Sequence, residues 1–321
     1  MWKIFIRPAM IFVPFGLGVL LQSAFKFSWS AGGADLSVWF IRISLMLMFF
    51  QICLQINLAG LRPRREHLKI LLANILMGVA PYFILKSLGF ETLALAAFFT
   101  GIAPTANAAP VVMGFLGGKV EFVLAGFAIN NIFIDLILIA LLPFISGGGG
   151  FGFALEAAGQ IASLVGIPII LAAAARKACK NARSIALRLR MFNFTLWCCT
   201  LFVIASKATM FFENTPGIPL KISIEIALVS LALCAANFFA GAKISSKRYA
   251  RESSQTLGQK NTTLAIFLAL VFGGQNAALV SLGPTFYVLW HNIYNALQIY
   301  FYDRRAVSRR LGAAKIKPAQ S

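Results

Sequence analysis

The sequence predicts an all-α polytopic membrane protein with ten transmembrane helices. Its mean hydropathy is +0.81 and 12% of its residues are charged, about half the share found in soluble domains. The formal net charge of +19 could suggest nucleic acid, but the basic residues gather in short loops between apolar segments. That distribution is the positive-inside pattern of membrane proteins. We therefore expect a lipid bilayer, and no nucleic acid, as the partner of this chain.

Ten apolar segments come close to the roughly 20 residues that a membrane-spanning helix needs. The predicted spans cover residues 4–21, 38–60, 68–89, 92–116, 121–144, 154–175, 192–212, 222–241, 262–281 and 284–302. With the N-terminus inside, this count places most of the 29 basic residues on the cytoplasmic side, and Lys260 falls in a cytoplasmic loop. Both termini are then cytoplasmic, and we expect a bacterial inner (plasma) membrane.

A run of glycines at 147–150 divides the chain into two halves of five spans each. The first half is 1–146, the second is 151–303, and 304–321 forms a basic cytoplasmic tail. Because each half has an odd number of spans, the two halves lie in opposite orientations. This is the inverted-repeat plan of many secondary transporters.

The fourth predicted span, 92–116, contains Pro104, Thr105, Asn107 and Pro110 where a span should be apolar. Proline removes a backbone donor and clashes with the preceding turn, so the helix should break here. Inside a bilayer, freed backbone groups are tolerated only where protein or a polar cavity satisfies them. The sequence therefore predicts a broken helix beside a polar site.

The fifth span carries Asn130, Asn131 and Asp135 near its middle. Asn131 and Asp135 are four residues apart and share a helix face. A carboxylate inside a membrane usually marks an ion or substrate pathway. The predicted ion-binding residues are Thr105, Asn107, Asn131, Asp135 and Gln275, and a sodium ion would bind at Asp135, Asn131 and Gln275.

The inverted plan requires a second interruption in the ninth span, 262–281. Gly273 and Gly274 are followed there by Gln275 and Asn276. Close helix packing would explain the glycines alone but not the two adjacent amides. The sequence thus predicts that helices four and nine are both broken and cross near the middle of the bilayer.

These motifs resemble those of the bile acid:sodium symporter family. The Gly-x-Gln-Asn run of the family's second crossover is matched by Gly273 to Asn276, and its Trp-His/Gln-Asn motif is matched by Trp290, His291 and Asn292. The Ala-Pro pair of its first crossover is matched by Ala103 and Pro104.

The resemblance implies a core domain of spans three to five and eight to ten, and a panel domain of spans one, two, six and seven. Sodium would bind where the broken helices cross, and an organic anion would bind between the domains. The substrate-binding residues would be Asn130, Gly273, Gly274, Asn276 and His291.

The chain also departs from the family pattern. Val271 stands where the family has a Glu two residues before the Gly of the second crossover, and an apolar residue near Leu76 replaces a Gln. Asp135 offers a carboxylate from a different helix, and that carboxylate could bind sodium or carry a proton. We expect a sodium-coupled secondary transporter of a small organic anion; the alternative is a proton-coupled or uncoupled carrier of the same fold.

Two other functions are weighed against transport. A membrane enzyme acting on a lipid would need paired acids or a nucleophile with its base, and the two histidines and ten acidic residues form no such cluster in the sequence. A related arsenite exporter would carry a cysteine in the first crossover, and residues 100–118 have none. We expect no enzymatic activity and no cofactor other than sodium, while the cargo and the oligomeric state stay open.

Overall fold

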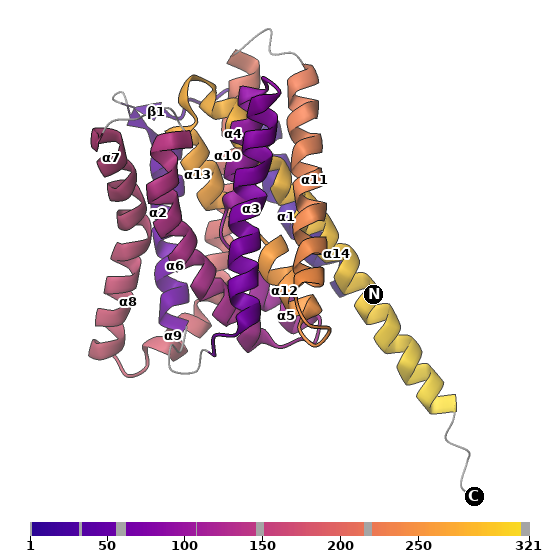
Figure 1. Cartoon of the computed structure of the whole chain (residues 1–321). Helices are drawn as coiled ribbons and strands as arrows, with labels where there is room; N and C mark the ends of the chain where they lie inside the picture. Colours follow the sequence, from indigo (N-terminus) through magenta and orange to yellow (C-terminus); the bar gives the residue numbers. More distant parts are fainter. Residues whose placement is uncertain are drawn as a thin grey trace, which may run out of the picture.

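Apolar helices lying side by side make up nearly all of the chain in the computed structural model (Figure 1). The structure describes residues 2–31, 34–55, 62–106, 108–145, 151–214 and 220–315. Within these ranges the all-α prediction is confirmed, apart from a hairpin of two-residue strands, β1 (Ser30–Ala31) and β2 (Ala34–Asp35). Asn107, the glycines at 147–150 and the last residues of the predicted tail lie outside the described residues.

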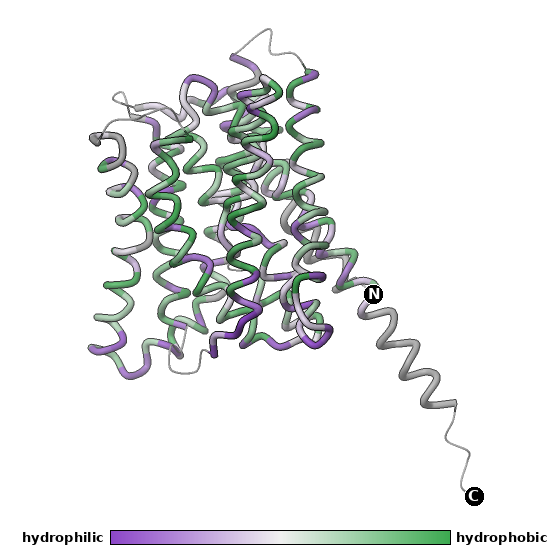
Figure 2. Tube along the Cα trace, viewed as in Figure 1, coloured by the Kyte–Doolittle hydropathy of each residue, from purple (hydrophilic) through white to green (hydrophobic). Residues whose placement is uncertain are grey.

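Six helical stretches in the described part of the chain are long and apolar enough to cross a membrane. They are α2 (Leu36–Gln55), α3 (Arg65–Ser87), α6 (Val120–Ile145), the stretch Ala158–Ala178, α10 (Arg190–Asn214) and α11 (Leu220–Ile244). Figure 2 shows green, apolar residues along the helices and purple, polar residues mainly at the ends of the bundle. On α3, Leu68, Leu72 and Leu76 are more than half exposed. Such an outward apolar face suits contact with lipid.

The remaining helices are shorter, or lie at the ends of the chain. They are α1 (Trp2–Phe25), α4 (Glu91–Ile102), α5 (Ala109–Phe115), α7 (Phe151–Ile161), the π-helical turn η2 (Ala162–Gly166), α8 (Ile167–Ala178), α9 (Ala182–Arg188), α12 (Ala250–Gly258), α13 (Thr262–Phe272), the 3₁₀ turn η3 (Gly274–Asn276) and α14 (Ala277–Lys315).

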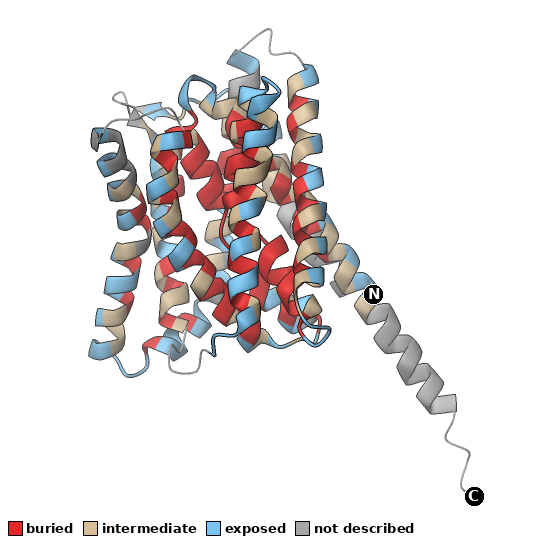
Figure 3. Ribbon diagram, viewed as in Figure 1, coloured by how far each residue is buried: buried red, intermediate tan, exposed pale blue. Residues whose placement is uncertain are grey.

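The helices pack as two groups. A first helix group consists of α1, α2, α8, α9 and α10, and a second helix group consists of α3 to α6 and α11 to α14. The groups meet mainly where α2 packs on α13 and where α1 and α10 approach α14. Figure 3 shows most of the buried residues in the second helix group, around α3, α12 and α13. The best-packed interior therefore surrounds the short helices.

Two glycines allow α4 to lie directly against α3. A Cβ atom at Gly101 would come within 2.0 Å of the Met77 carbonyl oxygen, and one at Gly78 within 2.6 Å of the Ile102 Cβ. Neither contact leaves room for a larger residue without a shift of the backbone or of Ile102. This close approach brings the last turn of α4 next to the buried Asn74 of α3.

The predicted interruption within 92–116 is confirmed, because α4 ends at Ile102 and α5 begins at Ala109. The predicted interruption at 273–276 is also present, as the turn between α13 and α14, where Gly274 has φ +67°. The prediction that this segment crosses the first interruption is wrong. The second interruption of the crossing lies at 259–261, between α12 and α13. Asn261 begins α13 there by accepting a hydrogen bond from the Leu264 N–H at 3.2 Å.

Candidate functional site

The two interrupted helices cross at their non-helical segments. Thr105 and Lys260 pair as an isolated antiparallel bridge. The Ala106 N–H donates to the Gln259 carbonyl and the Asn261 N–H donates to the Pro104 carbonyl, each at 2.7 Å. Figure 1 places α4 and α13 on one side of this crossing and α5 and α12 on the other. The backbone groups freed by each break therefore satisfy one another, as the interior of a bilayer requires.

Thr105 is the centre of a buried hydrogen-bond network. Its hydroxyl donates to the Thr256 carbonyl at 2.7 Å and accepts from Asn130 Nδ2 at 2.8 Å. Its carbonyl accepts from Asn131 Nδ2 at 3.0 Å. All three predicted residues, Thr105, Asn130 and Asn131, are buried. The structure thus brings these three together at the crossing.

Asp135 lies one turn beyond Asn131 on α6 and is 5% exposed. Neither of its carboxylate oxygens has a hydrogen-bond partner among the described residues. The Oδ1 atoms of Asn130 and Asn131 also lack partners in the described part of the chain. Because both amide nitrogens point to Thr105, α6 presents four unpartnered oxygen acceptors beside the crossing. Such acceptors can receive a proton donor or a cation.

Lys260 is the functional candidate that the sequence reasoning missed. The prediction placed it in a cytoplasmic loop, but the structure places it inside the bundle with 1% of its surface exposed. Its Nζ atom donates to Asn74 Oδ1 and, at 2.9 Å, to the Gly101 carbonyl. A sequence signal was present: Gly258, Gln259 and Asn261 surround Lys260 directly before an apolar run, as expected of a broken helix.

Asn74 connects Lys260 to the end of α4. Its Nδ2 atom donates to the Ile102 carbonyl at 2.8 Å and to the Ala103 carbonyl at 3.3 Å. These carbonyls belong to the last turn of α4 and to the residue after it, which have no partner further along the helix. Asn74 therefore satisfies the broken end of α4 and offers its own oxygen to Lys260.

Gln275 and Asn276 lie away from this network. Both are exposed in the η3 turn, and Asn276 Nδ2 contacts Thr92 Oγ1 at 3.3 Å. Thr92 lies at the start of α4, so the length of α4 (about 18 Å) and, beside it, that of α13 (about 16 Å) separate these residues from the crossing. The structure does not assemble the predicted sodium set of Asp135, Asn131 and Gln275, because the second interruption lies at the other end of α13.

The other predicted substrate-binding residues divide between the two places. Gly273 and Gly274 belong to the turn that carries Gln275. His291 is buried on α14, where its ring meets the Tyr287 ring edge-on at 5.5 Å. Tyr287 donates its hydroxyl hydrogen to the Gly258 carbonyl at 2.8 Å. His291 is therefore connected to the crossing through Tyr287.

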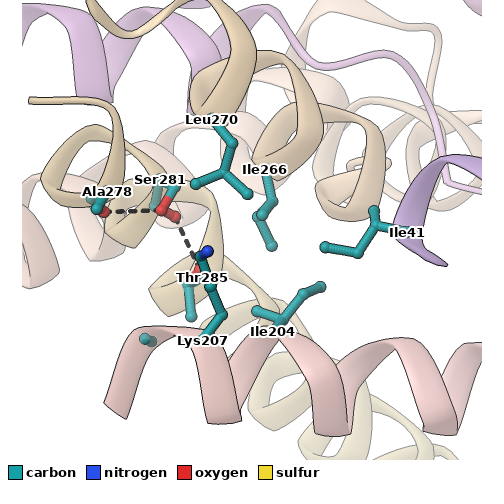
Figure 4. A pocket seen from close by; sticks show the side chains of 9 residues that line it. Ile41, Ile204, Lys207, Ile266, Leu270, Ala278, Ser281 and Thr285 are labelled. Atoms are coloured by element: carbon teal, nitrogen blue, oxygen red, sulfur yellow. Dashed lines mark hydrogen bonds between the residues drawn. The ribbon is translucent and has the colours of Figure 1, made fainter. Parts of the chain in front are cut away.

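A pocket lies between the two helix groups, lined from both sides. Its lining residues are Ile41 of α2, Ile204, Lys207 and Ala208 of α10, Ile266 and Leu270 of α13, and Ala278, Ser281 and Thr285 of α14. Figure 4 shows Lys207, Ser281 and Thr285 at one end of the pocket and Ile41, Ile204 and Ile266 toward the other. The pocket thus has a polar end and an apolar end. Its volume of about 20 Å³ holds about one water molecule, so a larger ligand requires the two helix groups to move apart.

Lys207 forms an ion pair with Asp35, in β2. Burial alone would raise the pKa of Asp35, but hydrogen bonds from Lys207 and Ser37, together with the lysine charge, outweigh it and hold the pKa below its ordinary value. On α2, Arg42 donates to Ser163 Oγ at 2.7 Å.

A comparison with protein-family models finds no family that matches the chain, and a comparison with curated proteins finds no significant match. In the part of the chain that the structure describes, no group of three or more His, Cys, Asp and Glu side chains is placed to hold a metal ion.

Proposed function

We propose that this protein is a secondary transporter of a small organic anion, working by alternating access. The observation that carries the proposal is the antiparallel crossing of two broken helices, with Thr105, Asn130 and Asn131 buried around it. Broken helices whose ends face a shared polar site are the usual construction of substrate and ion sites in secondary transporters. Such a site also explains why buried polar groups persist among apolar helices.

The helices fit a ten-span arrangement. Beside the six long helical stretches stand α1, α14 and the two broken pairs, α4 with α5 and α12 with α13. Each broken pair is then the fourth span of its half, and the two pairs run in opposite directions. This supports two inverted repeats, and an even number of spans keeps both termini on one side. The positive-inside pattern favours the cytoplasm of a bacterial inner membrane for that side.

The crossing supports the family resemblance with a different alignment. Gly258, Gln259, Lys260 and Asn261 match the Gly-x-Gln-Asn run, with Lys260 in the place of Gln. Thr256 then stands two residues before the Gly, where the family has Glu. On the ten-span arrangement, the second helix group contains the same spans as the family's core domain, and the first helix group the same spans as its panel domain.

The pocket between the helix groups supplies the proposed substrate site. Lys207, which also pairs with Asp35, would attract a carboxylate or similar anion through its remaining hydrogens. The hydroxyls of Ser281 and Thr285 would turn from the α14 carbonyls that they contact to orient this anion. The isoleucines at the opposite end would cover an apolar body. Because residues from both helix groups line the pocket, movement of one group against the other would open it to one side of the membrane or the other.

Ligand-induced thermal stabilisation of the detergent-purified protein tests this site. A ligand that binds only the folded state stabilises it by mass action. Organic monocarboxylates of graded size should raise the unfolding midpoint, whereas their uncharged amides should not. The Lys207→Gln variant should lose the response. Lys221→Gln is the matched control, because the Lys221 side chain is 84% exposed on α11. Equal stabilisation by acids and amides, or an unchanged response in Lys207→Gln, would contradict the proposed site.

Uptake into proteoliposomes then tests transport itself. The unpartnered Asp135 favours proton coupling, because neither oxygen is used within the described protein. An inward proton gradient should accelerate uptake of an acid found to bind, and Asp135→Asn should lose this acceleration while retaining exchange of labelled for unlabelled acid. Uptake that is indifferent to the proton gradient would favour an uncoupled carrier. If Asp135→Asn loses both binding and transport, Asp135 has a structural role instead.

A further inference from the structure

The position of the Lys260 amino group defines what can bind at the crossing. Nζ donates to an amide oxygen on α3 and to a carbonyl oxygen in the last turn of α4. Lys260 itself follows the end of α12 by two residues. The carbonyl ends of two half-helices, α4 and α12, therefore meet here, and such ends carry partial negative charge.

These acceptors are the kind that hold a coupling cation in transporters with broken helices. A sodium ion is held by backbone and amide oxygens, and both oxygens that Lys260 contacts are of these types. In this chain the amino group already occupies them. None of the ion pairs among the described residues involves Lys260, so an amide oxygen and a backbone carbonyl accept two of its hydrogens in place of a carboxylate.

We infer that the Lys260 amino group is a resident substitute for a coupling sodium ion at the helix crossing. This inference deepens the proposed transport function and rests on it for its physiological meaning. The amino group is covalently attached, so it stays at the crossing throughout the transport cycle and no sodium gradient drives the cargo. The sodium coupling expected from the family resemblance does not fit the residues present at this site.

The inference is tested by sodium binding rather than by transport. The result can therefore be interpreted even if the proposed substrate site proves to be wrong. The unfolding midpoint of the detergent-purified protein is measured over a series of sodium concentrations, with choline replacing sodium at constant ionic strength. The wild type should show the same midpoint throughout the series. A sodium-specific rise in the wild type would overturn the inference, whatever the variants do.

Removal of the amino group should create a sodium site. In Lys260→Gln, the shorter, uncharged side chain withdraws the amino group from the Asn74 oxygen and the Gly101 carbonyl, and its amide oxygen can become a further ligand. We expect the unfolding midpoint of Lys260→Gln to rise with the logarithm of the sodium concentration and to be insensitive to choline. Lys243→Gln, at an exposed position on α11, should behave like the wild type. If Lys260→Gln folds but shows no sodium response, the crossing is not a substituted cation site.

A second variant guards against a folding defect in the first. Lys260→Met keeps an unbranched side chain of the length that Lys has up to Cε and removes the amino group. The Met side chain fills most of the same space and offers no oxygen. It should fold without sodium and show no sodium response. The double variant Lys260→Gln/Asn74→Leu should also lack the response, because it removes one of the two oxygens. A sodium response that persists in this double variant would place the ion elsewhere and contradict the inference.

Discussion

Thr105 and Lys260 are backbone partners at the point where two broken helices cross. Their neighbours exchange two hydrogen bonds of 2.7 Å, so the end of α4 is attached to the end of α12. The side chain of each partner also binds neighbouring helices. The Thr105 hydroxyl accepts a hydrogen bond from the Asn130 amide of α6, and the Lys260 amino group donates hydrogen bonds to α3 and α4. The crossing is thus held together by four segments and should move as one unit.

Replacing Thr105 by Val should destabilise the protein. The substitution removes the acceptor of Asn130 Nδ2 and the donor to the Thr256 carbonyl, both inside the bundle. A buried polar group left without its partner costs roughly 1–3 kcal/mol. Thr200→Val is the matched control. Thr200 is equally buried, but among the described residues its hydroxyl bonds only to the Leu196 carbonyl in its own helix. Chemical unfolding in detergent micelles should show a clear loss for the first variant only; equal effects would refute a special role for Thr105.

Asn74 and Lys260 should be energetically coupled. Asn74→Leu alone leaves the Lys260 amino group with one acceptor fewer and removes the donor to the Ile102 carbonyl. We expect a loss of about 3 kcal/mol for a buried polar pair broken on one side. The double variant Asn74→Leu/Lys260→Met should recover part of this loss, because neither residue then buries an unpaired group. Strict additivity in the double-mutant cycle would show that the contact has no energetic weight.

Gly101→Ala should be severely destabilising despite the higher helix propensity of Ala. The new Cβ would lie 2.0 Å from the Met77 carbonyl oxygen and 2.9 Å from the Gly78 Cα. Backbone atoms of α3 cannot rotate away, so we expect a loss near the upper end of the usual overpacking range, about 3 kcal/mol. Gly16→Ala has no atom within 4 Å of the new Cβ and should be neutral or slightly stabilising. The thermal midpoints of the two variants distinguish close packing from helix propensity.

Stability should depend on pH through Asp35. Its pKa lies below the ordinary value in the folded protein, so its contribution is present above the unfolded pKa of about 3.9. That contribution is lost as the pH falls through the folded pKa. The difference in unfolding midpoint between wild type and Asp35→Asn should therefore be constant near neutral pH and shrink in acid. A difference that grows below pH 4 would contradict the Lys207 ion pair as its source.

The sequence predicted the helical class and an interruption within 92–116. Those predictions succeeded because apolar composition and proline in an apolar span act locally. The prediction placed the second segment of the crossing at the wrong end of 262–272, because helix-ending residues lie on both sides of this run. Gly273 and Gly274 resemble an interruption as closely as Gln259 and Asn261 do. Only the hydrogen bonds to Pro104 and Ala106 identify Gln259 and Asn261 as the residues of the crossing. These hydrogen bonds are tertiary contacts.

Lys260 was missed for a related reason. Counting basic residues in loops assigns a lysine near the start of a span to the cytoplasmic surface. The short helix α12 is polar by sequence, with a Ser, Ser, Gln, Thr run that suggests a loop. The structure buries this run inside the second helix group, against α11 and α6. Because this run is buried, Lys260 lies in the interior. Gly258, Gln259 and Asn261 around Lys260 indicate a helix break but not its burial.

Access to the pocket from both sides of the membrane tests the transport proposal most directly, because it needs no knowledge of the cargo. The five native cysteines would be replaced, and Ser281→Cys introduced in the pocket. Alternating access predicts that a membrane-impermeant maleimide labels this cysteine in right-side-out and in inside-out vesicles, with a ligand that binds the pocket slowing both reactions. Ala269→Cys, fully buried on α13, gives the background rate. Labelling no faster than this background from one of the two sides would contradict alternating access.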